Sequence, residues 1–147
     1  MATSAHSAWG TLLQLGDGAT PTEMFTTVAE VKDISGPALV TETEDVTSHD
    51  SPSGHIERIA TLIDTGEITF DVNLIPADAT HNETTGLASV ARDKTKHNFR
   101  ILFPTGSKMI SGPAIVTNME YGAEVAGVLQ ASVTLTPCGL WTVGASA

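Results

Sequence analysis

Residues 44–75 read EDVTSHDSPSGHIERIATLIDTGEITFDVNLI. Residues 67–74 alternate between apolar and polar side chains, with Ile68, Phe70, Val72 and Leu74 set against Glu67, Thr69, Asp71 and Asn73. A period of two indicates a β-strand with one buried and one solvated face. The sequence therefore predicts a strand over residues 67–75. A polar stretch rich in turn-forming residues precedes it and predicts a long loop at about 46–65.

The rest of the chain favours a mainly β protein. Thr, Val and Ala are abundant, and Gly and Pro separate short apolar runs. Further strands are expected at residues 9–15, 26–34, 38–47, 98–103, 114–119 and 128–136, with the second and third of these forming a hairpin around Gly36-Pro37. In the last strand Leu129, Ala131, Val133 and Leu135 are expected to face the core. Residues 82–96 predict the one helix, capped by Asn82 or Thr84, because Leu87, Val90, Ala91 and Lys94 share a face.

These elements predict a β-sandwich or partly open β-barrel of antiparallel strands, with one flanking α-helix at about 82–96 and the long loop at about 46–65. At 147 residues the chain is long enough for one domain with a substantial core. No linker or internal repeat divides it, so we expect a single domain over residues 1–147.

The formal charge of −10 is unevenly distributed along the chain. Residues 1–91 hold 14 of the 17 acidic residues, and four of the seven basic residues lie close together at Arg92, Lys94, Lys96 and Arg100. Two interpretations remain open. The acidic residues form a solvated surface, or they meet the basic patch of a neighbouring copy of the chain. A nucleic-acid-binding protein is disfavoured, because it needs a dominant basic face.

The sequence predicts no catalytic residue, no metal site and no cofactor. The five histidines form no ligand pair with metal-site spacing, and the single cysteine, Cys138, excludes a disulfide within the chain. Ser48-His49-Asp50 contains the residue types of a catalytic triad, but adjacent residues cannot converge as a triad does. No apolar run approaches the ~20 residues of a membrane span, and a signal peptide is not evident. We therefore expect no membrane insertion.

Three blocks of the sequence resemble tail tube proteins of long-tailed, siphovirus-like bacteriophages. The first runs from SHDSP at residues 48–52 to GEITF at residues 66–70. The second is NFRILFP at residues 98–104, and the third is ASVTLT at residues 131–136. Their order, with a helix before the second block, also resembles that family. Some relatives carry a C-terminal immunoglobulin-like domain, which we do not expect here.

The resemblance implies a structural virion protein and not an enzyme. Homo-hexameric rings would stack into the hollow tail tube, through which double-stranded DNA passes into the host without specific binding. Expected partners are the tape-measure protein, the tail tip or distal tail proteins and the tail terminator protein. The expected location is the virion tail, assembled in the cytoplasm of the host bacterium. A secretion tube protein of the Hcp type and a small β-sandwich hydrolase are the alternatives.

Within that assembly the sequence suggests three groups of contact residues. Glu67 and Asp71 are candidate lumen-facing acids, because they lie on the polar side of an alternating strand. The loop is expected to be mobile in the free subunit and ordered between rings. Its candidate contact residues are Ser48, His49, Asp50, Pro52, Gly54, Ile56, Arg58, Ile59 and Leu62. The third group is the basic inter-subunit patch at Arg92, Lys94, Lys96 and Arg100.

Overall fold

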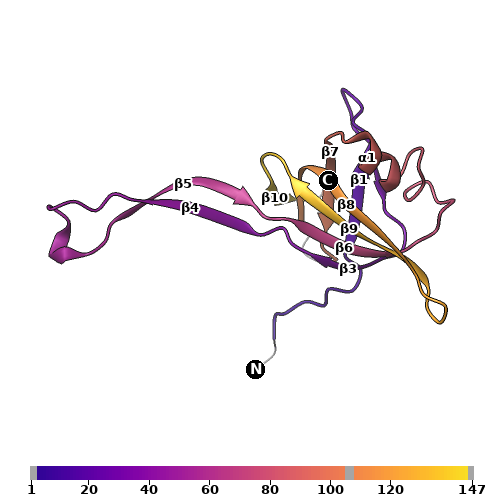
Figure 1. The fold of residues 1–147 in the computed structure, drawn as a ribbon, viewed down its shortest axis with the longest axis horizontal. Helices are drawn as coiled ribbons and strands as arrows, with labels where there is room; N and C mark the ends of the chain where they lie inside the picture. Colours follow the sequence, from indigo (N-terminus) through magenta and orange to yellow (C-terminus); the bar gives the residue numbers. More distant parts are fainter. Residues whose placement is uncertain (1–2, 105–107, 146–147) are drawn as a thin grey trace.

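The structure is a computed structural model that describes residues 3–104 and 108–145. Those residues form ten β-strands, one α-helix and one short 3-10 helix (Figure 1). The strands are β1 (Leu12–Gly16), β2 (Phe25–Thr27), β3 (Val31–Ser35), β4 (Leu39–Asp45), β5 (Arg58–Thr65), β6 (Ile68–Asn73), β7 (His97–Leu102), β8 (Lys108–Ala123), β9 (Leu129–Pro137) and β10 (Thr142–Ala145). The helices are η1 (Pro52–Gly54) and α1 (Leu87–Asp93).

Eight strands form one antiparallel sheet in the order β2-β1-β7-β8-β9-β6-β3, with β10 beside β8. The long strand β8 joins the two halves of this sheet, because its first part pairs with β7 and its later part pairs with β9. A bulge between Val116 and Asn118 lies close to the change of partner, where a bulge can bend the strand. The sheet does not close into a barrel, and the predicted mainly β, sandwich-like class is confirmed.

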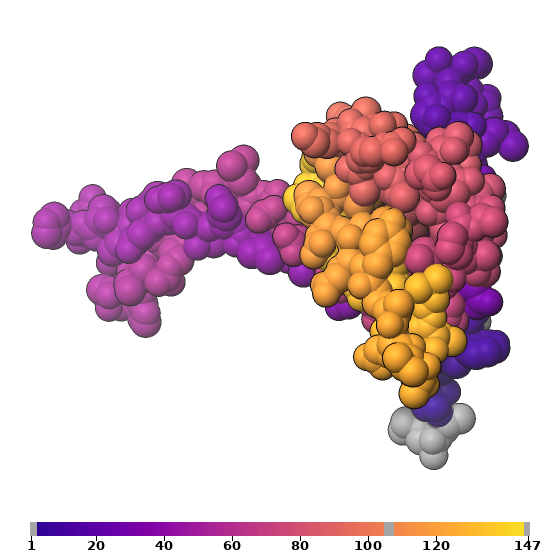
Figure 2. Space-filling model, turned by 45° about the vertical axis from the view of Figure 1, so that its right-hand side comes forward, coloured from indigo at the N-terminus to yellow at the C-terminus, as the bar shows by residue number. Residues whose placement is uncertain are grey.

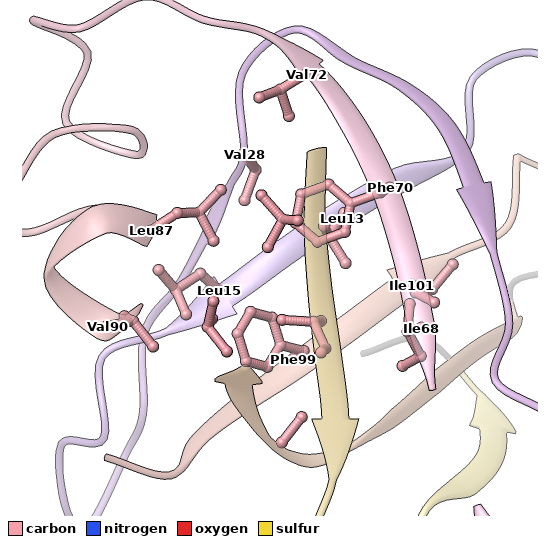
Figure 3. Packing of buried hydrophobic residues seen from close by; sticks show 14 of the residues in the cluster. Leu13, Leu15, Val28, Ile68, Phe70, Val72, Leu87, Val90, Phe99 and Ile101 are labelled. Carbon is pink, nitrogen blue, oxygen red and sulfur yellow. The ribbon is translucent and has the colours of Figure 1, made fainter. Parts of the chain in front are cut away.

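The core lies between the two halves of the sheet. Ile68, Phe70 and Val72 of β6 are buried, as the alternation predicted. Ala131, Val133 and Leu135 of β9 are buried in the same way, whereas Leu129, expected in the core, is 41% exposed at the end of the strand. Figure 3 shows Phe70 and Phe99 near the middle of the cluster. Burial of each large side chain contributes about 1.5–3 kcal/mol, so this cluster holds the body together.

The α-helix is shorter than the 15-residue helix expected at 82–96. The side-chain oxygen of Asn82 accepts hydrogen bonds from the backbone N–H groups of Thr85 and Gly86, so it closes a loop and does not begin a helix. The helix starts after Gly86 and ends at Lys94, which adopts a left-handed conformation. Leu87 and Val90 are buried against the sheet, as predicted (Figure 3), whereas Lys94 is exposed.

The predicted long loop at 46–65 is wrong in its second half. Residues Arg58–Thr65 form β5, which pairs with β4 in a separate two-stranded sheet. Only residues 46–57 remain as a connection, and these include η1. We call residues 38–66 the arm, because Figures 1 and 2 show this hairpin extending far from the body of the molecule. The sequence did not predict the pairing of β4 with β5, because β5 has no apolar–polar alternation and is exposed along almost its whole length.

The predicted hairpin between residues 26–34 and 38–47 is also wrong. Residues 31–35 form β3, which pairs with β6, while β4 continues away into the arm. The chain passes very close to β6 at Gly36, where an added Cβ would lie 2.6 Å from the backbone oxygen of Glu67. Gly36 also has a φ of +99°, which a side chain would disfavour. The Gly-Pro pair therefore directs the chain past β6 and does not reverse it onto β3.

Candidate assembly surfaces

The arm has two chemically different faces. Residues directly opposite each other in an antiparallel pair lie on the same face, and successive residues alternate between faces. The register pairs Val40 with Asp64 and Glu44 with Ile59. We call this side the carboxylate face; its members are Val40, Glu42, Glu44, Ile59 and Asp64. The other side, the neutral face, comprises Leu39, Thr41, Thr43, Asp45, Arg58, Ala60, Ile63 and Thr65.

Neither face of the arm is covered by the described residues. Every residue of β4 is exposed, and in β5 only Thr65 is half-buried. Leu62 and Ile63 are 70% and 68% exposed. A two-stranded hairpin is marginally stable by itself in water, and exposed apolar side chains that gather on a surface often mark an interaction site. The arm therefore has the composition of a surface that another protein chain covers.

The tip of the arm is ordered by its own hydrogen bonds. The Ser51 hydroxyl donates to the Glu57 carboxylate at 2.7 Å and accepts from the Ser48 backbone N–H at 2.9 Å. At the start of the tip the Thr47 hydroxyl and backbone N–H donate to Asp45 and lower the pKa of its carboxyl, and the opposed Arg58 lowers it further. The polar residues expected to lack structure thus form a compact turn.

The structure places the predicted contact residues of the loop in two parts of the arm. Arg58, Ile59 and Leu62 belong to β5 and thus to the paired part. The remaining predicted residues lie in the tip, and all are exposed: Ser48, His49, Asp50, Pro52, Gly54 and Ile56.

The second surface is the outer, polar side of the sheet formed by β3, β6, β9 and β8. Asp71 of β6 lies opposite Ser132 of β9, which in turn lies opposite Glu120 of β8. The Ser132 hydroxyl donates to Asp71 at 2.7 Å. In the neighbouring row, Lys32 Nζ donates to Gln130 Oε1 at 3.0 Å. Polar side chains also flank these rows at Thr69, Asn73, Asn118 and Thr134.

Glu67 lies at the beginning of this surface. It is exposed between β5 and β6 and lies toward the arm, whereas Asp71 is half-buried within β6. Sequence reasoning missed Glu120. A regular alternation of apolar and polar residues along β8 would have identified Glu120, but the bulge at Val116–Asn118 interrupts this alternation.

The four predicted basic residues lie in two different environments. Arg92 is in the last turn of α1, with Lys94 and Lys96 just beyond it, and all three are exposed. Arg100 lies on β7 and stacks on Phe25, with the guanidinium carbon 3.6 Å from the ring centre. This cation–π contact binds Arg100 to its own subunit. Among the four, Arg92, Lys94 and Lys96 therefore form the exposed basic group beside the helix.

The sheet of β3, β6, β9 and β8 ends in two strand edges. Among the described residues, β3 pairs only with β6, and the second half of β8 pairs only with β9. A groove of about 350 Å³ runs between that half of β8 and α1, and its lining includes Ala91, Arg92, Met119 and Tyr121. Because all pairings are antiparallel, β3 runs opposite to β8. The two edges of one copy could thus pair antiparallel with those of another.

No cluster of three or more metal-ligating side chains occurs in the described part of the chain. His81 is buried and acts structurally. Its Nδ1 accepts from the Ile75 backbone N–H at 3.1 Å, and its Nε2 lies 2.7 Å from the Ala29 carbonyl oxygen. An N–H can only donate, so Nδ1 is the acceptor and the proton lies on Nε2. Within residues 3–104 and 108–145, no helix is long and apolar enough to cross a membrane.

Solved structures share this fold over nearly the whole chain. The tail of an empty gene transfer agent particle, refined with C6 symmetry, has a TM-score of 0.76 at 21% identity and covers 96% of this chain and 100% of that chain. The SPP1 tail tube has a TM-score of 0.62 at 13% identity, with coverages of 92% and 76%. The sheath–tube complex of an extracellular contractile injection system has a TM-score of 0.67 at 12% identity, with coverages of 97% and 93%. These TM-scores show a common fold.

No curated protein sequence matches the chain significantly. A family model does match it: the lambda phage tail tube protein model aligns with residues 15–144, which is most of the chain. The match agrees with the resemblance read from the three sequence blocks and sets aside the hydrolase alternative. The chain therefore belongs to the lambda phage tail tube protein family, as a structural component of the virion tail and not an enzyme.

Proposed function

We propose that six copies of this chain form a ring, and that rings stack into the hollow tail tube of a siphovirus-like phage. The observation that carries the proposal is the arm, a hairpin with both faces exposed that projects from the body (Figure 2). Because members of this family are tail tube proteins, other copies of the chain are the expected partner of the arm. The C6 symmetry of the gene transfer agent tail supports the number six.

Ring closure pairs the two strand edges. The β3 edge of one copy aligns antiparallel with the second half of β8 in the next copy, beside α1. This contact is heterologous, since different surfaces meet, and such contacts form rings when the rotation closes. Pairing also removes exposed strand edges, which otherwise promote aggregation.

The polar side of the β3-β6-β9-β8 sheet lines the lumen. When the ring closes through the edges of that sheet, one side of the sheet faces the channel. The other side packs on the buried core, so the polar side is the one that faces inward. Glu67, Asp71 and Glu120 then present carboxylates to the channel. Carboxylates repel the phosphates of double-stranded DNA, so DNA passes without being bound.

The arm reaches the adjacent ring, and its tip and β5 residues supply the inter-ring contact. Its carboxylate face meets the exposed basic group at Arg92, Lys94 and Lys96 of another copy. This pairing of charges explains why acids gather in the first part of the chain and bases just after it. Arg100 contributes less, because its guanidinium already stacks on Phe25.

The same tube would contact other tail components. We propose the tape-measure protein inside the growing tube, the tail tip or distal tail proteins at its start, and the tail terminator at its end. The tube-terminating cap and the baseplate of the anti-feeding prophage contain chains of similar fold. A secretion tube protein of the Hcp type is less well supported, because the family match is to a phage tail tube protein.

Shortening the arm tests the proposal. A variant in which a Gly-Ser turn replaces residues 42–61 should remain folded, because the arm contributes no residue to the buried core. It should form no tubes at concentrations, or with tail tip complexes, that polymerise the full chain. A matched control keeps the whole arm and carries Thr22→Ala on the exposed β1–β2 loop; it should polymerise like the unchanged chain. Tubes of normal length from the shortened variant would contradict an assembly role for the arm.

A further inference from the structure

An apolar groove lies at the base of the arm and is not explained by the surfaces above. It has a volume of about 640 Å³ and lies between the N-terminal segment at residues 6–11, the end of β3 and the strands β7 and β10. Ile34, Ile101, Phe103 and Val143 line it, together with Lys108. Phe103 and Val143 are 41% and 64% exposed. The groove is thus a place where the sandwich is open and its apolar interior meets solvent.

The turn between β8 and β9 has a complementary character. It reads AEVAGVL over residues 123–129 and projects from the body on the side away from the arm (Figure 1). Val125 and Val128 are fully and mostly exposed, and they lie three residues apart in the same turn. Glu124 supplies the one charge in this turn, which we call the β8–β9 turn.

The groove and the β8–β9 turn lie at opposite ends of the same sheet. The register places Ile34 opposite Phe70, toward the arm, and Val31 opposite Val72, toward the other end. The next pair along β6 and β9, Asn73 and Gln130, lies closer still to the β8–β9 turn. Two copies stacked end to end along the strand direction would therefore bring the turn of one copy to the groove of the other. The same stacking leaves the lateral edges of β3 and β8 available for ring closure.

Charge supports this pairing. The turn carries a carboxylate at Glu124, and the groove carries an ammonium at Lys108 beside its apolar lining. We propose that the β8–β9 turn of a subunit in one ring docks in the apolar groove of a subunit in the next ring, with Val125 and Val128 inside and Glu124 near Lys108. This inference rests on the proposed stacking of rings and assigns it a second contact, separate from the arm.

Cross-linking tests the proximity. Because Cys138 is the only cysteine, variants with Cys138→Ser allow single cysteines to be placed at will. Subunits with Val125→Cys and subunits with Val143→Cys are mixed, assembled and treated with a short bismaleimide. A cross-linked dimer should appear in mixed tubes and not in unassembled subunits. The matched control replaces the Val143→Cys subunit with an Ile59→Cys subunit. Stronger cross-linking of Val125→Cys or Val143→Cys to the arm cysteine would overturn the proposal.

Charge reversal tests the contact independently. Glu124→Lys and Lys108→Glu should each raise the critical concentration for tube growth by about threefold or more, because each creates a like-charge pair. Combining them should restore growth toward that of the unchanged chain. Thr22→Lys, on the exposed β1–β2 loop and outside the proposed contacts, is the control and should leave growth unaffected. The inference would be overturned if the single variants grew normally or if the double variant did not recover. Normal tubes from the unchanged chain would still support the proposed function. Failure of the unchanged chain to form tubes would instead contradict that function.

Discussion

At the scale of single residues, a small hydrogen-bond cluster fixes the long connection between β6 and α1. The Thr80 hydroxyl and backbone N–H donate to Asp78, and the same hydroxyl accepts from the Ala29 backbone N–H at 3.1 Å. The neighbouring His81 binds the Ala29 carbonyl. Both backbone groups of Ala29 are therefore satisfied by side chains from this connection. The cluster holds the β2–β3 turn, and thus the start of the β3 edge, in place.

Removing the carboxylate of this cluster gives a pH-dependent prediction. Hydrogen bonds from Thr80 lower the pKa of Asp78, so its contribution to stability is present above the unfolded value of about 3.9 and is lost as the pH falls through the folded value. Asp78→Ala should therefore lower Tm by a few degrees at pH 7, and the difference should shrink below about pH 4. Thermal unfolding of both proteins measures this, with Glu83→Ala as control. An equal Tm difference at pH 7 and pH 2.5 would contradict the assignment.

Close packing of β8 against Trp141 gives a second prediction at this scale. A Cβ added to Gly112 would lie 2.5–2.6 Å from atoms of the Trp141 ring, which is buried and donates from Nε1 to the Pro113 carbonyl. Gly112→Ala should lower the free energy of unfolding by about 1–3 kcal/mol through overpacking. Gly144→Ala is the matched control, because none of the described residues lies within 4 Å of its added Cβ. Chemical denaturation of the two variants should differ; equal stability would show that Trp141 moves without cost.

At the scale of elements, the sequence predicted those strands that have one buried and one solvated face. The alternation in β6 and β9 is regular because each strand covers the core with one side. The arm strands could not be recognised in this way, since neither of their faces meets the core and Ile59, Leu62 and Ile63 follow no period of two. The helix was overextended because Asn82 satisfies loop backbone groups, a pattern that resembles a helix cap in sequence.

The same limit applies to the candidate surfaces. Glu67 and Asp71 could be placed on one side of a strand from their spacing. Glu120 required knowledge of the bulge in β8, and its proximity to Ser132 depends on which strands pair. The basic residues were correctly seen as close in sequence, but the stacking of Arg100 on Phe25 depends on strands β1, β2 and β7 meeting in the sheet.

The arm should act through both of its faces. Ile63→Asp places a charge on the neutral face, where the side chain is already 68% exposed, so the monomer Tm should change by less than about 2 °C. Tube formation should fail, because the charge would be buried without a partner in the assembled tube. Thermal unfolding and electron microscopy of the same sample separate the two effects. Ile63→Val is the matched control and should polymerise. Normal tubes from Ile63→Asp would place the neutral face in solvent.

At the scale of the whole molecule, three surfaces point in different directions and suit one architecture. The strand edges lie laterally, the arm and the β8–β9 turn lie at the two ends, and the polar side of one sheet faces away from the core. Lateral edges close a ring, end surfaces stack rings, and a polar wall bounds a channel. In the proposed tube each of these surfaces has one role, and the carboxylates of the polar wall suit the passage of a polyanion.

The channel assignment predicts a defect in DNA delivery without a defect in assembly. Replacing both Glu67 and Asp71 with Lys should leave tubes intact and slow DNA ejection, because contacts with phosphates must then be released one after another. Ejection into liposomes or host cells, followed by dye fluorescence at low and high salt, measures the effect. High salt should reduce it. Unchanged ejection from normal tubes would place these two residues outside the channel.

The central claim is self-assembly into a hollow sixfold tube, and cryo-electron microscopy of concentrated or tip-seeded protein tests it most directly. The account predicts straight tubes whose averaged cross-section has six subunits, an open channel lined by β6, β8 and β9, and arms that cross to the adjacent ring. Protein that remains a monodisperse monomer at high concentration and with tail tip complexes would contradict the account, as would tubes whose channel is lined by α1.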